Sequence, residues 1–141
     1  MGVVYCGAYA DLIGDEHEGY AARRLADGTL TGTWTAATAE FNAYVGACGC
    51  GWRAPVEREP NEAGEAAALE DWDREHLQLL IAQARRAWLP WAERVGSRAR
   101  TVAGHVAEGR LDLAVSVAER LEADIAFWRR IAEGLVEEAR R

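Results

Sequence analysis

The chain has 141 residues, 50% of them hydrophobic, and it carries a formal net charge of −7. This length and composition fit one compact domain or two small ones and exclude wholesale disorder. The acidic charge disfavours nucleic acid as a partner, and no apolar run approaches the roughly 20 residues that a membrane-spanning helix needs.

Residues 1–60 are predicted to form an antiparallel β-module of three or four short strands. Apolar or alternating runs occupy residues 3–9, 20–25, 30–35 and 41–47. Asp27 and Gly28 separate the second run from the third and favour a tight hairpin turn, because both residue types tolerate a positive φ. Residues 53–60 contain two prolines between charged side chains and are predicted to be a loop.

Residues 61–141 are predicted to be helical. Asn61 suits the N-cap of a first helix, because its side chain can accept a hydrogen bond from a backbone amide of the first turn. Pro90 lies inside the helical pattern, where it removes a backbone donor and clashes with the preceding turn. We therefore expect a kink or a break near residue 90.

Two apolar stripes with helical spacing run away from residues 109–110 in opposite directions. If the chain folds back there, Trp91 faces Trp128 and the flanking positions pair in a single antiparallel register, with large side chains opposite small ones in several layers. Gly109 suits the end of one helix and Asp112 the cap of the next. The predicted fold is therefore α+β, with the β-module followed by a long antiparallel helical hairpin.

This hairpin has more large apolar side chains than two helices can bury against each other. We expect the surplus to lie against a second copy of the chain, another protein or the β-module, and we favour a homodimer in which two hairpins form a four-helix bundle. The residues predicted for this interface are Trp88, Trp91, Trp128 and Ile131.

Two cysteines and a histidine on the first helix suggest a metal site. Cys48 and Cys50 lie in a glycine-rich turn, and His76 follows on the helix. Thiolate and imidazole are the usual ligands of zinc, which prefers four of them, so that His17 or Cys6 would supply the fourth. A second interpretation is that the thiols are simply buried and the histidine packed, with no metal bound. Redox or nucleophilic use of the thiols is a third interpretation.

The same residues carry a resemblance. The segments CGCGW at residues 48–52, NEAGE at 61–65 and WDREH at 72–76 resemble a group of uncharacterised small actinobacterial proteins. These proteins share a Cys-x-Cys-Gly-Trp knuckle before a helix with Trp-x-x-x-His. The resemblance covers residues 28–82 and leaves the hairpin outside. It implies that Cys48, Cys50 and His76 act as a unit, and it implies no particular activity.

An enzyme is the least supported class, because no spacing of acid, base and nucleophile stands out. The carboxylates of the first helix spread around its surface and are predicted to be a solvated face. They are Glu70, Asp71, Asp73 and Glu75.

A run of arginines precedes the predicted turn: Arg85, Arg86, Arg94, Arg98 and Arg100. One interpretation is a face that contacts nucleic-acid phosphates. The other, which we favour, is pairing with the acids Glu119, Glu122 and Asp124 of the last helix, because the local charges complement each other. The run lacks the interleaved aromatic side chains that stack on bases.

The function predicted from the sequence is a non-catalytic binding or regulatory protein that acts through its helical hairpin, with a zinc knuckle as support. No leader segment is evident, so we expect a cytoplasmic location. The first alternative is a DNA-associated regulator that uses the arginine face between Arg85 and Arg110. The second is a thiol-based redox sensor or enzyme.

Overall fold

The computed structural model describes residues 2–141, which form two compact units. The sheet unit contains residues 2–6 and 10–82, and the hairpin unit contains residues 7–9 and 83–141. The predicted α+β class, an antiparallel sheet followed by long helices, is confirmed. The units divide after residue 82, and not after residue 60, because the first long helix packs on the sheet.

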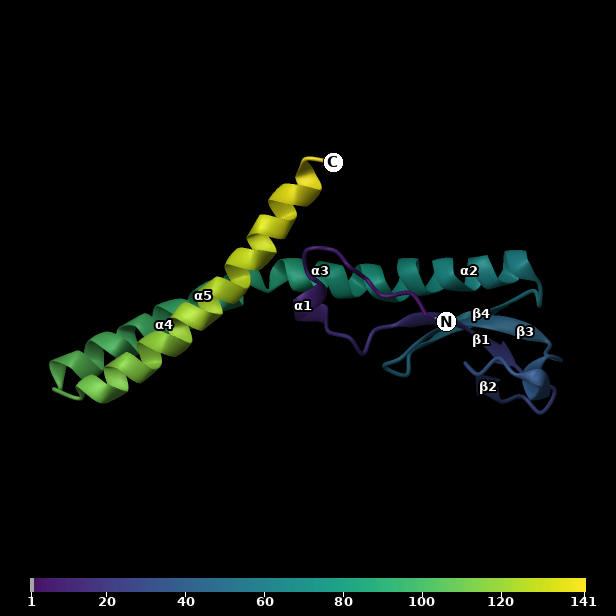
Figure 1. The fold of residues 1–141 in the computed structure, drawn as a ribbon, viewed down its shortest axis with the longest axis horizontal. Helices are drawn as coiled ribbons and strands as arrows, with labels where there is room; N and C mark the ends of the chain where they lie inside the picture. The colour runs from purple at the N-terminus through teal and green to yellow at the C-terminus, as the bar shows by residue number, and fades with distance from the viewer. Residues whose placement is uncertain (1) are drawn as a thin grey trace. The chain divides into compact units, whose positions relative to one another are not determined.

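The sheet unit is built on a four-stranded antiparallel sheet with the strand order β2-β1-β3-β4 (Figure 1). Its strands are β1 (Gly19–Arg24), β2 (Leu30–Thr31), β3 (Ala43–Cys48) and β4 (Arg53–Arg58). β1 and β3 pair along their full length, with Gly19 opposite Cys48 at one end. Every residue of β3 is buried, so this strand forms the centre of the unit.

The N-terminal run at residues 3–9 is not the predicted strand. Only Val3 makes an isolated antiparallel bridge, to Gly19, through two backbone hydrogen bonds of 2.7 and 2.8 Å. A short helix, α1 (Ala10–Ile13), follows. Val3 and Val4 are about half exposed, and Tyr9 is buried in the hairpin unit, so the apolar character of this segment does not make it a strand of the sheet.

Two more predicted elements differ from the observed ones. The strand expected at residues 30–35 ends after two residues, and the 3₁₀ turn η1 (Ala36–Thr38) follows it. The loop expected at residues 53–60 is wrong, because β4 occupies most of it. Pro55 is tolerated in β4 because this strand lies at the edge of the sheet, where one side needs no ladder hydrogen bonds.

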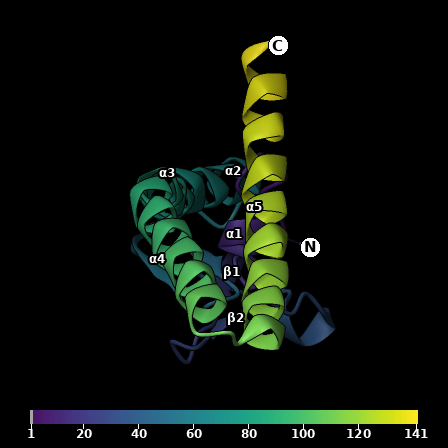
Figure 2. The ribbon, with the colours of Figure 1, turned by 90° about the vertical axis from the view of Figure 1, so that its left-hand side faces the viewer.

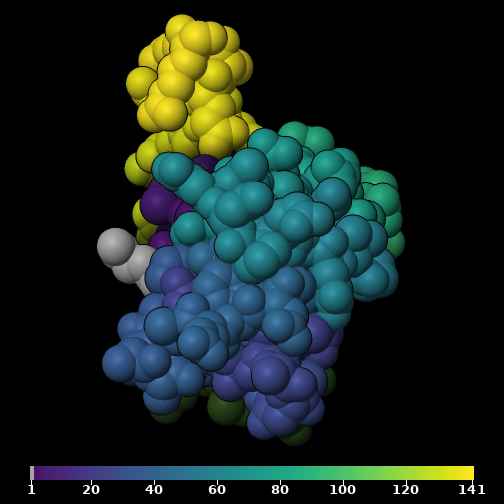
Figure 3. All heavy atoms as spheres, turned by 90° about the vertical axis from the view of Figure 1, so that its right-hand side faces the viewer, coloured from purple at the N-terminus to yellow at the C-terminus, as the bar shows by residue number. Residues whose placement is uncertain are grey.

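One face of the sheet is covered by α2 (Glu62–Trp72), which contacts β1, β3 and β4. Figure 3 shows the side chains of this helix (teal) lying directly on those of the sheet unit (blue). Asn61 caps α2 as predicted, since its side chain accepts a hydrogen bond of 2.8 Å from the backbone N–H of Gly64. The π-helical segment η2 (Asp73–Leu77) and then α3 (Gln78–Arg86) continue the chain.

A buried ion pair joins α2 to the edge strand. Asp71 is 1% exposed and accepts two hydrogen bonds from the guanidinium of Arg58, at 2.7 and 2.8 Å, and one from Arg74 at 2.8 Å. The hydrogen bonds from Arg58 hold the pKa of Asp71 below its usual value, and burial opposes them. The prediction of a solvated acidic face is therefore wrong at Asp71. Its partner Arg58 lies in β4, a segment that was predicted to be a loop.

The hairpin unit consists mainly of α4 (Trp88–Ala107) and α5 (Leu111–Ala139), which pack side by side (Figure 2). The predicted break near residue 90 is confirmed, since α3 ends at Arg86 and α4 begins at Trp88. Pro90 lies in the first turn of α4, where its missing N–H removes no helical hydrogen bond.

The turn between α4 and α5 lies where the sequence predicts it. Gly109 has a φ of +73°, and its N–H donates to the carbonyl of Val106 at 3.1 Å. The N–H of Arg110 donates to the carbonyl of His105 at 2.8 Å, which completes a Schellman motif. The predicted cap of α5 is wrong, because Arg110 takes the N-cap position and Asp112 lies within the first turn. Its charge there still complements the helix dipole.

Tryptophans form the core of the hairpin unit. The ring centroids of Trp91 and Trp128 lie 5.5 Å apart, which confirms the predicted pair, and Trp88 lies 4.7 Å from Trp128. The indole N–H of Trp88 donates to the hydroxyl of Tyr9 at 3.0 Å. Trp128 and Ile131 are only 3% and 2% exposed, so they lie inside a single chain and not on the surface, where the predicted interface would need them.

Candidate metal centre

Four metal-ligating side chains meet in the sheet unit. His17 precedes β1, Cys48 ends β3, Cys50 lies in the following turn and His76 lies in η2. One ligand atom from each lies within 4.8 Å of the other three. The three residues grouped from the sequence, Cys48, Cys50 and His76, therefore lie together in the structure. The fourth member is His17 and not Cys6.

Three of the distances within this group are short, and none exceeds 4.8 Å. The Sγ atom of Cys48 lies 3.6 Å from Nδ1 of His17, and the Sγ atom of Cys50 lies 3.4 Å from Nε2 of His76. The two histidine nitrogens are 3.4 Å apart. Donor atoms at such distances can surround one ion, so the group can bind a metal.

Strand register and a tight turn place the two cysteines and His17 together. Because Gly19 pairs with Cys48, the residues just before β1 lie beside the end of β3. The turn after Cys48 is closed by a hydrogen bond of 2.9 Å from the N–H of Gly51 to the Cys48 carbonyl. Gly51 has a φ of +104°, which side-chain-bearing residues rarely adopt. The turn therefore returns the Cys50 thiol to the end of the sheet.

Two tryptophans support the histidine and the buried thiol. The ring of Trp52 stacks on His76, with centroids 4.9 Å apart and an interplanar angle of 14°. Trp72 is 2% exposed and lies against Gly19, where a Cβ atom would overlap its indole ring. Glycine at the first residue of β1 is thus what allows α2 to approach the strand end that carries the cluster.

The electrostatics of the cluster favour neutral ligands in the absence of a cation. Burial raises the pKa of the Cys48 thiol above its usual value. Burial, followed by the charge of His17, lowers the pKa of His76. His76 therefore keeps a free lone pair at neutral pH, and a bound cation would favour the Cys48 thiolate.

Cys6 is not part of the cluster. Its thiol is exposed and donates a hydrogen bond of 3.4 Å to the carbonyl of Val4. The sequence alone left open whether Cys6 or His17 is the fourth ligand, because both precede β1. The register of the strands decides which of them reaches Cys48.

The arginines of residues 85–100 were predicted to pair with acids of the last helix, and only one of them does. Arg98 pairs with Asp124 of α5 at 3.0 Å, which confirms that prediction at one position. Within residues 2–141 no ion pair involves the other four arginines of the run, which are Arg85, Arg86, Arg94 and Arg100.

Sequence reasoning missed the residues that support the cluster. Trp52 and Trp72 carried a signal, since one directly follows the cysteine turn and the other lies one helical turn before His76. The pairing of Arg58 with Asp71 carried none, because it depends on β4.

Comparison of the chain with protein families, with curated proteins and with solved structures finds no match. Within the described part of the chain, no helix combines the length and the apolar character that crossing a membrane requires.

Proposed function

We propose that His17, Cys48, Cys50 and His76 hold one zinc ion, which stabilises the sheet unit of a non-catalytic binding or regulatory protein. The observation that carries this proposal is the spacing of the donors. Zinc bonds of about 2.3 Å to sulfur and about 2.05 Å to nitrogen, in a tetrahedron, place unlike donors roughly 3.6 Å apart and two nitrogens roughly 3.3 Å apart. The three observed distances lie between 3.4 and 3.6 Å.

The donor set favours zinc over other metals. Two thiolates and two imidazoles in a tetrahedron are typical of zinc, whereas magnesium and calcium prefer oxygen ligands. Four protein ligands also fill the tetrahedron, which leaves no position for a substrate or a reactive water. These properties favour a structural role of the ion.

A zinc ion here would join parts of the chain that are far apart in sequence. Its ligands come from residue 17, residues 48–50 and residue 76. Closing such loops is entropically unfavourable, and metal binding by a folded site offsets that cost. The ion would therefore hold the start of β1, the end of β3 and η2 together.

The hairpin is the surface through which we propose that the protein acts. Large apolar side chains remain exposed on α4 and α5, between 41% and 77% each, and they are Leu89, Val106, Leu111, Leu113, Val115, Ile125 and Val136. Exposed apolar residues at this density favour a protein partner, either a second copy or another chain.

Elemental analysis with native mass spectrometry tests the zinc centre. The wild-type protein, purified without added metal, is expected to carry one zinc ion per chain. Cys48→Ser is expected to lose the ion, and Cys6→Ser, which changes a thiol outside the cluster, is expected to keep it. A metal-free wild-type protein that is as stable as a zinc-supplemented sample would contradict the proposal. The same spectra give the oligomeric state, and a dimer would support association through the hairpin.

A DNA-associated regulator is the second candidate. It is favoured by Arg85, Arg86, Arg94 and Arg100, which form no ion pair within the described residues 2–141. Phosphate contacts make the affinity fall steeply as the salt concentration rises, whereas association through an apolar helix face does not. Binding to duplex DNA measured between about 50 and 200 mM salt therefore separates the two candidates.

A further inference from the structure

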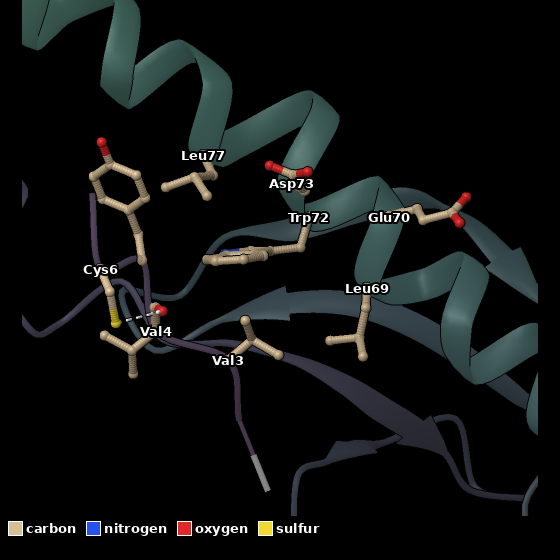
Figure 4. Close-up of a pocket in the computed structure, with 9 residues that line it drawn as sticks. Val3, Val4, Cys6, Leu69, Glu70, Trp72, Asp73 and Leu77 are labelled. Carbon is tan, nitrogen blue, oxygen red and sulfur yellow. Dashed lines mark hydrogen bonds between the residues drawn. The ribbon is translucent and has the colours of Figure 1, made fainter. Parts of the chain in front are cut away.

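A cavity of about 410 Å³ lies in the sheet unit between the N-terminal segment and the helix that covers the sheet (Figure 4). Most of its lining is apolar and includes Val3, Val4, Leu69, Trp72 and Leu77, and Tyr5, Cys6, Glu70 and Asp73 complete it. This volume falls within the range of pockets that bind small molecules, which are typically apolar with a few polar groups.

The walls of this cavity are held in place before any ligand binds. Val3 is fixed by its backbone bridge to Gly19. Trp72 is fixed because its ring lies against Gly19, and Leu77 is 6% exposed. By contrast, Val3 and Val4 leave 46% and 49% of their surface exposed, as expected for side chains that face an open cavity. A ligand would therefore enter a preformed site at a small cost in ordering.

The charge at the cavity is negative and uncompensated. Glu70 and Asp73 are its charged lining residues, and no arginine lines it. In Figure 4 the carboxylate of Asp73 lies beside the indole of Trp72, whereas Glu70 points away. Asp73 accepts a hydrogen bond of 2.9 Å from the neutral amide of Gln78. The nearest arginine on the helix, Arg74, is paired with Asp71 and Glu75.

We propose that this cavity binds a small primary ammonium ion that carries an apolar group. The apolar group would contact the accessible side chains of Val3, Val4 and Leu69, which removes hydrocarbon from water. The ammonium group would lie at the mouth, where the carboxylate of Asp73 attracts a cation. An anion of the same size would be repelled by the same carboxylate. The proposal does not depend on the zinc ion, which lies outside the cavity lining.

Three probes of matched size test the proposal: n-hexylammonium, n-hexanol and hexanoate. Each is titrated into the full-length protein as purified, and the amide resonances of Leu69 and Leu77 are followed by NMR. We expect hexylammonium to bind most tightly, hexanol more weakly and hexanoate least. Equal binding of all three, or binding of none, would overturn the proposal. The zinc content of the same sample is measured separately, so that failure of the zinc centre is not confused with failure of the cavity.

Two pairs of variants locate the binding. Asp73→Asn keeps the hydrogen bond to Gln78 and is expected to weaken hexylammonium binding about tenfold while leaving hexanol unchanged. Asp112→Asn, in the hairpin unit, is the control for the change in charge. Leu69→Trp fills the cavity and should abolish binding of every probe, whereas Leu79→Trp, at a position that is 61% exposed, should not. Retained binding in Leu69→Trp, with an unchanged circular dichroism spectrum, would contradict the assignment.

Discussion

The sheet unit and the hairpin unit are stabilised in different ways. In the sheet unit, polar groups from distant parts of the chain meet in the His and Cys cluster and in the pairing of Asp71 with Arg58. The hairpin unit depends on a repeated apolar pattern, in which Trp91 and Trp128 pack across two neighbouring helices. The sheet unit therefore contains specific long-range polar contacts, whereas the hairpin unit contains a repeated apolar interface between two helices.

This difference determines how each unit should respond to perturbation. Removing one partner of a buried polar group leaves the other without compensation, so the loss is abrupt. Removing one apolar side chain from a long helix pair leaves the rest of the interface in place, so the loss is graded. Perturbing each unit by itself and measuring its unfolding therefore tests this contrast.

The largest expected effect is the removal of zinc. A ligand present at a thousandfold excess over its Kd stabilises the folded state by about 4 kcal/mol, and a strong chelator removes that term. Amides of β1 and β3 should then lose protection from exchange, while those of α5 should keep theirs. Equal loss in both units would show that they do not differ in this way.

Truncation of the central tryptophan comes next. Trp128→Ala removes a side chain that is 3% exposed and touches both Trp88 and Trp91. We expect the free energy of unfolding of the hairpin unit to fall by about 3–4 kcal/mol, with the zinc content unchanged. The control is Phe127→Ala on the same helix, which is less buried and should lose less stability. An equal effect of the two substitutions would contradict the predicted core.

Asp71→Asn should destabilise the sheet unit by about 2–3 kcal/mol. The substitution removes the charge that Arg58 and Arg74 share, and the loss is reduced because both guanidinium groups keep access to water. Urea unfolding of the zinc-loaded protein measures it. Glu75→Gln, which removes a more exposed partner of Arg74, is the matched control and should change stability by less than about 1 kcal/mol.

Acidification should destabilise the sheet unit in two steps. The pKa of His76 is held below its usual 6.5 and that of Asp71 below 3.8, so at both sites the folded unit binds fewer protons than the unfolded chain. Each contribution is complete above the unfolded pKa and is lost as the pH falls from that value towards the folded pKa. Protonation of zinc ligands acts in the same direction. Urea midpoints that rise between pH 7.5 and pH 5 would contradict this assignment.

The contrast between the units also explains what could be predicted from the sequence. The hairpin, its turn and the facing tryptophans follow from helical periodicity, a proline and a glycine, all of which act locally. The sheet unit was predicted less well, because the role of Pro55 depends on β4 being an edge strand and the burial of Asp71 depends on Arg58 reaching across from that strand. Local patterns contain neither fact.

The candidate site divides along the same line. Cys48, Cys50 and His76 could be grouped from the sequence because two cysteines in a glycine-rich turn and a histidine on the following helix are typical zinc ligands. The choice between His17 and Cys6 could not be made, since it requires the strand register that places Gly19 opposite Cys48. The cavity beside Trp72 had no sequence signal, because it forms between an N-terminal segment predicted to be a strand and the middle of a helix.

The smallest effect is expected from substitution of two glycines near the turn of the hairpin. These substitutions test whether local backbone conformation determines where the chain reverses. Gly109 has a φ of +73°, so Gly109→Ala strains the turn and should destabilise the hairpin unit by about 1 kcal/mol. Gly104 lies inside α4 with open space around it, so Gly104→Ala should stabilise the unit by up to about 1 kcal/mol. The same chemical change is thus expected to have opposite signs five residues apart. Thermal unfolding of the two variants measures both, and a common sign would mean that packing around the turn, and not its backbone conformation, determines where the chain reverses.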